Sequence, residues 1–225
     1  MIDLSPFWLT ARLASITTII LLVISVPVAN WLAYGKSKIK LVIETLVSMP
    51  LVLPPSVLGF YLLVAFSPQN AFGKFLDHYF STRLVFSFGG LVICSVIYSL
   101  PFMIHPIQSG LKNLSPSLRE ASFTLGKSRM TTLIKILLPN IRASVITGLV
   151  LTFAHTVGEF GVVLMVGGSI PGKTKVISIT VFDEVESMNY HTANIYAAIL
   201  FAFSFLILFS VYLVNSKSNE VSPLR

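Results

Sequence analysis

"LREASFTLGKSRMTTLIKILLP", residues 118–139, is a polar, basic block that lies between long hydrophobic segments and ends in a proline. It contains a single glycine, Gly126, which can adopt backbone angles that other residues avoid and so predicts a sharp bend. Just upstream, Ser115 precedes Pro116, an order typical of a helix N-cap followed by the first helical residue. The block therefore predicts two short helices joined at Gly126, with Glu120 near the positive end of the first helix.

The composition around this block is that of a membrane protein. Hydrophobic residues make up 54% of the 225 residues and charged residues 11%, and the mean hydropathy is +0.83. Soluble domains carry about 25% charged residues, and a water-soluble fold could not bury this much apolar surface. In a membrane protein, the net charge of +7 indicates cytoplasmic loops rather than nucleic-acid binding.

Five stretches are long enough to cross a bilayer, which takes about 20 apolar residues. They are Leu13–Tyr34, Leu46–Phe66, Phe86–Ile107, Ile141–Val166 and Ala193–Val214. A sixth crossing stays open, either at residues 6–8 or at residues 70–80, although charged side chains favour a short interfacial helix for the second region. The sequence therefore predicts an all-α, polytopic membrane bundle, with residues 1–225 forming a single transmembrane domain.

The basic residues predict the orientation of this bundle. Eleven of the sixteen Lys and Arg residues fall on the side of the 118–139 block, and five fall on the other side. Cytoplasmic loops carry the excess of Lys and Arg. We therefore expect a multi-pass protein of the cytoplasmic (inner) membrane with its N-terminus outside and its C-terminus in the cytoplasm.

Prolines interrupt the second expected span. The stretch "MPLVLPPSVLGF", residues 49–60, contains Pro50, Pro54 and Pro55. Proline removes a backbone donor, and broken helices at membrane depth persist only where protein or a water-filled cavity covers them. Transport pathways use such breaks. Two interpretations stay open, a pathway lined by these prolines and a kinked helix in a static bundle.

One motif suggests nucleotide binding but does not fit it. "GGSIPGKT", residues 167–174, matches the pattern G-x-x-x-x-G-K-[ST] of a phosphate-binding loop. Only nine residues separate Lys173 from Asp183, whereas a crossover between parallel strands takes a dozen or more residues. Pro171 also restricts the loop, and the charge count places it outside the cell. We expect an exposed loop of turns.

The 118–139 block resembles the EAA loop of ABC importer permeases, whose pattern is E-A-A-x3-G-x9-I-x-L-P. The matching residues are Glu120, Ala121, Ser122, Gly126, Ile136, Leu138 and Pro139, with Ser122 in place of the usual alanine. The resemblance implies that these residues couple the chain to a separate ATP-hydrolysing subunit.

Two further stretches narrow the resemblance. "FAHTVGEFGVVLMVGGSIPGKT", residues 153–174, is similar to a segment of molybdate, tungstate and sulfate permeases, and "MPLVLPPSVLGFYLL", residues 49–63, resembles the molybdate permeases. The chain is identified as a member of the molybdate ABC permease family, with transport of tungstate or of sulfate and thiosulfate as alternatives. The resemblance implies alternating access, two permease copies, two ATPase subunits and an external oxyanion-binding protein.

Glu159 is the ionisable residue of interest in the fourth expected span, flanked by Gly158 and Gly161. A charge at membrane depth is costly and indicates a functional site. A carboxylate would repel a dianion, so we expect a gate or hinge, with His155 one turn earlier as a candidate partner. A static contact between helices is the alternative.

The sequence shows no pattern of an enzyme. No basic cluster lies within the spans, no His and Cys residues have metal-ligand spacing, and no nucleophile has a matching base. We therefore expect no catalytic residue, cofactor or metal, and membrane lipid rather than nucleic acid as the surroundings. An ion-coupled secondary transporter is a remaining alternative, but Glu159 alone gives it little support.

Overall fold

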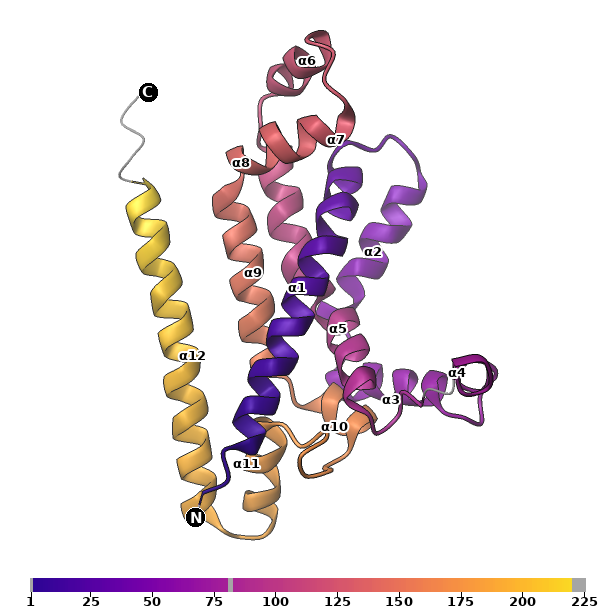
Figure 1. Ribbon diagram of the computed structural model, residues 1–225, viewed down its shortest axis with the longest axis vertical. Coiled ribbons are helices and arrows are strands. Elements are labelled where there is room, and N and C mark those ends of the chain that lie inside the picture. The colour runs from indigo at the N-terminus through magenta and orange to yellow at the C-terminus, as the bar shows by residue number, and fades with distance from the viewer. Residues whose placement is uncertain (1, 81–82, 220–225) are drawn as a thin grey trace.

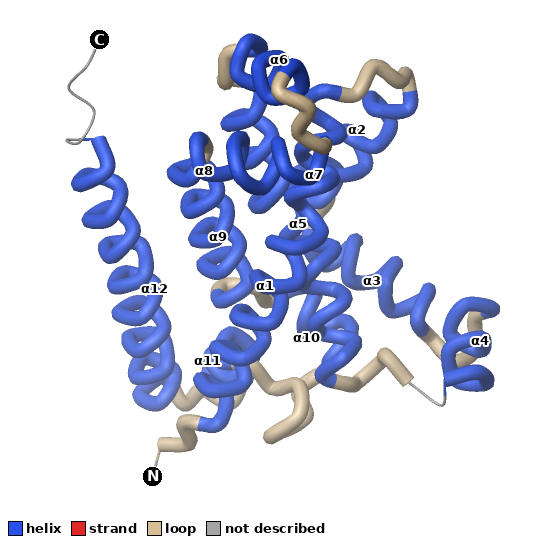
Figure 2. The backbone as a smooth tube through the Cα atoms, turned by 45° about the horizontal axis from the view of Figure 1, so that its top comes forward, coloured by secondary structure: helices blue, strands red, loops and turns tan. Residues whose placement is uncertain are grey.

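The computed structural model describes residues 2–80 and 83–219, and within these ranges the chain consists of helices and loops without strands (Figures 1 and 2). The helices are α1 Ser5–Tyr34, α2 Ile39–Val52, α3 Pro55–Phe66, α4 Ala71–Phe80, α5 Phe88–Lys112, α6 Pro116–Thr124, α7 Arg129–Thr132, the π-helix η1 Leu133–Leu137, α8 Leu138–Asn140, α9 Arg142–Val157, α10 Gly161–Gly167, α11 Ile177–Glu186 and α12 Tyr190–Asn219. The prediction of an all-α membrane bundle is confirmed.

Three described helices are long and apolar enough to cross a membrane on their own, namely α1, α5 and the part of α12 from Tyr190 to Phe209. Two further spans form only as bent pairs, α2 with α3 and residues 129–140 with α9. Counting each pair as one span gives five, which is the expected number, although the second pair covers residues 129–157 instead of the expected Ile141–Val166. Residues 6–8 lie inside α1 and add no sixth crossing, and residues 71–80 form the short helix α4.

The centre of the bundle is the contact among α1, α5 and α9, which stand side by side in Figure 1. Its buried side chains include Leu21, Leu32, Met103, Ile107 and Leu111. Small residues allow the close approach that van der Waals packing between membrane helices requires. A Cβ atom on Gly110 of α5 would lie only 2.5 Å from the Ser144 hydroxyl oxygen of α9, so this contact needs glycine.

The second expected span, Leu46–Phe66, is two helices that meet at an angle of 116°. The helix α2 begins earlier than expected, at Ile39, and contains Pro50, which is buried. It ends before Leu53 and Pro54, and α3 starts at Pro55. Because these two prolines cannot donate to the preceding turn, they allow the helix to stop here.

The fourth expected span, Ile141–Val166, is not one continuous helix. The helix α9 ends at Val157, and α10 begins at Gly161 after a short turn. The helices α3 and α10 then pack on each other, because a Cβ atom on Gly161 would lie 2.8 Å from Pro55 Cβ and one on Gly59 would lie 2.9 Å from Met165 Cβ. The helices that follow these two breaks are far apart in the sequence, but they therefore pack directly on each other.

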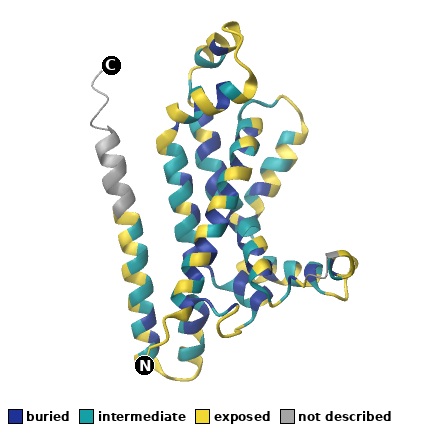
Figure 3. Cartoon of the chain, viewed as in Figure 1, coloured by how far each residue is buried: buried dark blue, intermediate teal, exposed yellow. Residues whose placement is uncertain are grey.

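The outer faces of the bundle carry exposed apolar side chains, and Figure 3 shows mostly exposed and half-buried residues along the described part of α12. Phe201 of α12 is 74% exposed, and Val23 of α1 is 69% exposed. Such surfaces are unfavourable in water but suit the hydrocarbon core of a bilayer, where lipid tails cover them. The exposed faces of the long helices thus agree with a membrane-embedded bundle.

Candidate functional site

The 118–139 block lies at the end of the molecule where α1 finishes and α9 begins, and α6 forms the tip at this end (Figure 1). As predicted, α6 starts at Pro116 with Ser115 at the N-cap. The Ser115 hydroxyl, however, pairs with the hydroxyl of Ser117 at 2.7 Å and caps no backbone amide. Glu120 is exposed and is the fifth residue of α6, so it lies just beyond the first turn, whereas the sequence predicted a position near the positive helix end.

The bend at Gly126 is confirmed. Its φ angle is +70°, in the left-handed region that favours glycine, and a Cβ atom there would meet nothing within 4 Å. Beyond the bend, Ser128 caps α7 by accepting a hydrogen bond from the Thr131 amide at 3.2 Å. The block therefore consists of α6, a glycine turn and a second helical segment that starts at Arg129.

Ser122, which departs from the family's alanine, connects the two helical segments. Its hydroxyl is buried and lies 2.8 Å from the Thr132 hydroxyl, which donates its own proton to the Ser128 carbonyl at 2.9 Å. A threonine hydroxyl has one proton, so Ser122 must be the donor to Thr132. The hydroxyl does more than keep the side chain small, and the sequence pattern did not predict this bond.

The other residues of the EAA pattern divide by exposure. Ala121 and Pro139 are exposed, Ile136 and Leu138 are half-buried, and the side chains that anchor the segment in the core are Leu133 and Leu137. Those two were not singled out, although their spacing of four residues within an apolar run was the available signal. Four large apolar side chains of the block are left exposed, Phe123, Leu125, Met130 and Ile134. An exposed apolar surface of this kind marks an interaction site.

A cation–π contact holds this block to the bundle. The Arg119 guanidinium of α6 lies 4.4 Å from the centre of the Tyr34 ring at the end of α1. The Tyr34 hydroxyl donates to the Leu111 carbonyl of α5 at 2.8 Å, which fixes the ring. Through Tyr34, α6 is thus connected to the ends of α1 and α5. Arg119 and Tyr34 are 85 positions apart in the sequence, so no local pattern indicates their contact.

The second candidate region surrounds the turn between α9 and α10. A cavity of about 570 Å³ is lined there by Pro55, Gly158, Glu159 and Gly161, together with side chains of α5 and α9. Pro50 and Pro54 are not among its lining residues. Four of the six residues expected to form a pathway or gate therefore line one cavity. Pro55 comes from the start of α3, and the other three come from the turn between α9 and α10 and from the start of α10.

Glu159 is the buried acid of this cavity. The residue is 3% exposed. Neither carboxyl oxygen has a hydrogen-bond partner of good geometry among the described residues, but the Ser95 hydroxyl of α5 is placed to act on the carboxyl as a donor. Its backbone carbonyl accepts a hydrogen bond from the Ser178 hydroxyl of α11 at 2.6 Å. A buried carboxyl without a well-formed hydrogen bond is costly, and such groups are retained at functional sites.

The expected pairing of His155 with Glu159 is wrong. The His155 ring nitrogen Nδ1 lies 3.0 Å from the Ser99 hydroxyl, and the ring stacks on Phe102 with centroids 4.0 Å apart. The helix α9 ends at Val157, so Glu159 no longer lies one helical turn above His155. The two glycines beside Glu159 differ in what they allow. Gly161 is needed for the close contact with Pro55, whereas a Cβ atom on Gly158 would meet no atom closer than 3.7 Å, so no close approach requires glycine there.

The loop at residues 167–174 contains turns and is exposed from Ser169 to Lys173, as the sequence predicted. The amides of Lys173, Thr174 and Lys175 all donate to the Ile170 carbonyl, so they do not point into a phosphate site. The loop follows the helix α10 rather than a strand.

Asp183, the acid that follows this loop, is part of the same local structure. Its carboxylate accepts hydrogen bonds from Lys175 at 2.7 Å and from Ser169 at 2.6 Å. Burial would raise the pKa of this carboxyl, but these two hydrogen bonds hold the pKa below its ordinary value. Asp183 is thus an ionised partner of the loop.

Comparisons with known proteins agree on one family. The model of the family "Binding-protein-dependent transport system inner membrane component" matches residues 12–218. The molybdenum transport permease ModB of Azotobacter vinelandii is 45% identical over 93% of both chains. The sulfate transport permease CysT of Salmonella typhimurium is 32% identical over 78% of this chain and 63% of its own length.

A solved structure shows the same fold. The bacterial ABC transporter that imports alginate has a chain that superposes with a TM-score of 0.75, at 16% identity, over 97% of this chain and 79% of its own. With the family model covering residues 12–218 and a 45% identical permease aligned along its length, the chain belongs to the inner membrane components of binding-protein-dependent transport systems.

Proposed function

We propose that the chain is the permease subunit of an ATP-driven importer that moves molybdate across the inner membrane. The observation that carries this proposal is the 45% identity to ModB along 93% of both chains. The sulfate permease CysT of Salmonella typhimurium is the second candidate for function, but its identity is 32% and the match covers 63% of its length. As a permease subunit, the chain forms the membrane pathway and hydrolyses no ATP itself.

The 118–139 block is the proposed contact with the ATPase. Leu125 is 75% exposed, Met130 is 63% exposed and Ile134 is 53% exposed, so the block offers apolar anchors to a groove on another subunit. The block is held to α1 through Arg119 and Tyr34, so movement of the ATPase would be transmitted to the bundle. One block per chain supports two permease copies with two ATPase subunits and an external binding protein that delivers the oxyanion.

The cavity at Glu159 is the proposed gate. The two short helices α3 and α10 start at this cavity and pack on each other, so a shift of either would change its width. A carboxylate repels a dianion, so Glu159 acts on the movement of these helices rather than on binding of the cargo. In this proposal, Pro50, Pro54 and Pro55 supply the break that separates α3 from α2.

Substrate choice is tested with the purified chain reconstituted in liposomes with its ATPase and binding protein. We expect ATP-dependent uptake of labelled molybdate that an excess of unlabelled molybdate suppresses and an excess of sulfate leaves unchanged. Uptake of labelled sulfate at the same rate would overturn the choice of molybdate but leave the permease assignment standing, and absence of any uptake of the tested oxyanions, tungstate included, would overturn both.

Coupling is tested with Gly126→Val, and Gly172→Val is the matched control. Both glycines have φ near +70° and open space around them, so each valine pays a similar backbone cost of about 1–2 kcal/mol. Only Gly126 lies in the 118–139 block. We expect Gly126→Val to reduce both co-purification of the ATPase and uptake, and Gly172→Val to leave co-purification unchanged; an equal loss in both would argue against coupling at this bend.

The orientation is tested by labelling single cysteines. The native Cys94 is buried, and replacing it with alanine removes any background. Lys127→Cys and Lys173→Cys are then treated with a membrane-impermeant thiol reagent. From the distribution of basic residues, we expect labelling of position 173 in intact cells and of position 127 only after permeabilisation. The reverse pattern would invert the proposed topology.

The gate is tested with Glu159→Gln, which keeps the shape of the side chain and removes its ability to ionise. Because the carboxyl has no hydrogen-bond partner of good geometry among the described residues, assembly should survive while transport per ATP hydrolysed changes. Ser178→Ala is the control, since within the described residues the Ser178 hydroxyl bonds the backbone carbonyl of Glu159 and not its carboxyl. Parallel assays of uptake and hydrolysis decide the role, and unchanged coupling in a stable Gln variant would exclude Glu159 from gating.

A further inference from the structure

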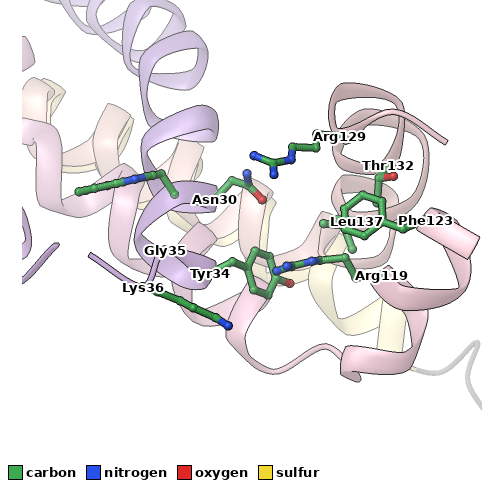
Figure 4. A pocket seen from close by; sticks show the side chains of 10 residues that line it. Asn30, Tyr34, Gly35, Lys36, Arg119, Phe123, Arg129, Thr132 and Leu137 are labelled. Atoms are coloured by element: carbon green, nitrogen blue, oxygen red, sulfur yellow. The ribbon is translucent and has the colours of Figure 1, made fainter. Parts of the chain in front are cut away.

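A separate cavity of about 310 Å³ lies where α1 ends against the 118–139 block. Figure 4 shows side chains that converge on it from α1, α6 and α7, with Arg129 extending toward Asn30 and Arg119 lying along Tyr34. Three of its lining residues carry positive charge, Lys36, Arg119 and Arg129. We call this the basic cavity.

No acidic residue lines the basic cavity, and the three cations form none of the ion pairs found within the described chain. Such ion pairs instead involve Arg83, Lys112 and Lys175. Within the part of the chain that the structure describes, the positive charge around this concave space is therefore left without an ion-pair partner. A cavity with this charge balance favours an anion.

Arg119 is pre-positioned for such a ligand. Its guanidinium lies 4.4 Å from the Tyr34 ring and 5.6 Å from the Phe123 ring, which stack against it without taking up its N–H groups. The Tyr34 ring is itself fixed by its hydrogen bond to the Leu111 carbonyl. An arginine held in this way loses less conformational entropy when its planar N–H fork binds an oxyanion.

The basic cavity lies at the membrane boundary. Trp31 and Tyr34, which line it near the end of α1, are amphipathic aromatic residues of the kind enriched at the level of lipid headgroups. In the proposed orientation this end of α1 faces the cytoplasm. Basic pockets between membrane helices on that side bind lipid phosphates.

We propose that the basic cavity binds a tetrahedral phosphate-type oxyanion through Arg119, Arg129 and Lys36, with the Asn30 amide as a further donor. Guanidinium groups match the geometry of such anions, because two parallel N–H groups can reach two oxygens. The ligand is either the headgroup of an anionic phospholipid or a free oxyanion of the cytoplasm. Occupancy would connect α1 to the 118–139 block at the point where Arg119 contacts Tyr34.

Binding is measured by the fluorescence of Trp31, which lines the cavity. The chain contains two tryptophans, so Trp8→Phe in the full-length chain leaves Trp31 as the only one. At constant ionic strength, the detergent-solubilised chain is titrated with short-chain phosphatidylglycerol, short-chain phosphatidylcholine, sodium phosphate and sodium molybdate. A response to phosphatidylglycerol alone identifies a lipid headgroup, and a response to phosphate or molybdate identifies a free oxyanion.

Arg129→Gln is the test variant, and Lys127→Gln is its matched control. Both remove one positive charge from the 118–139 block, but only Arg129 lines the cavity. We expect Arg129→Gln to weaken anion binding by about tenfold or more, the loss typical of a charge-assisted hydrogen bond, and Lys127→Gln to change it little. Arg119→Gln should weaken binding as well.

Three results would overturn the proposal. One is the absence of a Trp31 response to all the anions, and another is an equal response to phosphatidylcholine and phosphatidylglycerol. The third is an equal loss in Arg129→Gln and Lys127→Gln, which would indicate general attraction by the basic block rather than a site. None of these outcomes bears on molybdate uptake, so the basic cavity and the proposed function fail independently.

Discussion

Every backbone amide and carbonyl that lies in hydrocarbon must find its hydrogen bond within the protein, and the architecture of this chain follows from that constraint. It explains why α1 and α5 remain long continuous helices although α1 contains Pro27 and α5 contains Pro101 and Pro106, and it limits where the chain can break. The breaks at Leu53–Pro54 and at Gly158–Phe160 occur where α3 and α10 pack together and cover each other. At the second break, the Ser178 hydroxyl satisfies the Glu159 carbonyl that a continuous helix would have bonded. The cavity at Glu159 therefore exists because the two interruptions are placed side by side.

At the opposite end of the bundle, the fold of the 118–139 block depends on local hydrogen bonds and on one glycine turn rather than on burial in the membrane. The 118–139 block is folded by three local devices, the left-handed Gly126, the Ser128 cap and the bond between Ser122 and Thr132. It is then attached to the bundle by buried leucines of η1 and by Arg119 on Tyr34. A block that is internally rigid and attached to the central helices is suited to transmit force from another subunit to them.

The two candidate regions are joined through the same helices. The helix α9 starts next to the 118–139 block and ends beside Glu159, while α5 bonds Tyr34 at one end and lines the Glu159 cavity with Tyr98. Close packing of α5 on α9 at Gly110 and Ser144 leaves little room for the two helices to slide independently. Movement applied at one end of this pair would therefore reach the other end as a displacement of rigid elements.

The sequence by itself determined the class of fold, the all-helical composition, the approximate positions of the three continuous spans, and the bend at Gly126. These features depend on hydrophobic length and on the backbone preferences of glycine and proline, which act locally. The tertiary structure alone decided that Ile141–Val166 breaks at Gly158, that His155 bonds Ser99 instead of Glu159, and that Ser122 bonds Thr132. It also brought Arg119 to Tyr34, and Pro55 to Gly161. Each of these depends on which helix faces meet after the chain has packed, and the free energy of such contacts is set by neighbours that are distant in the sequence.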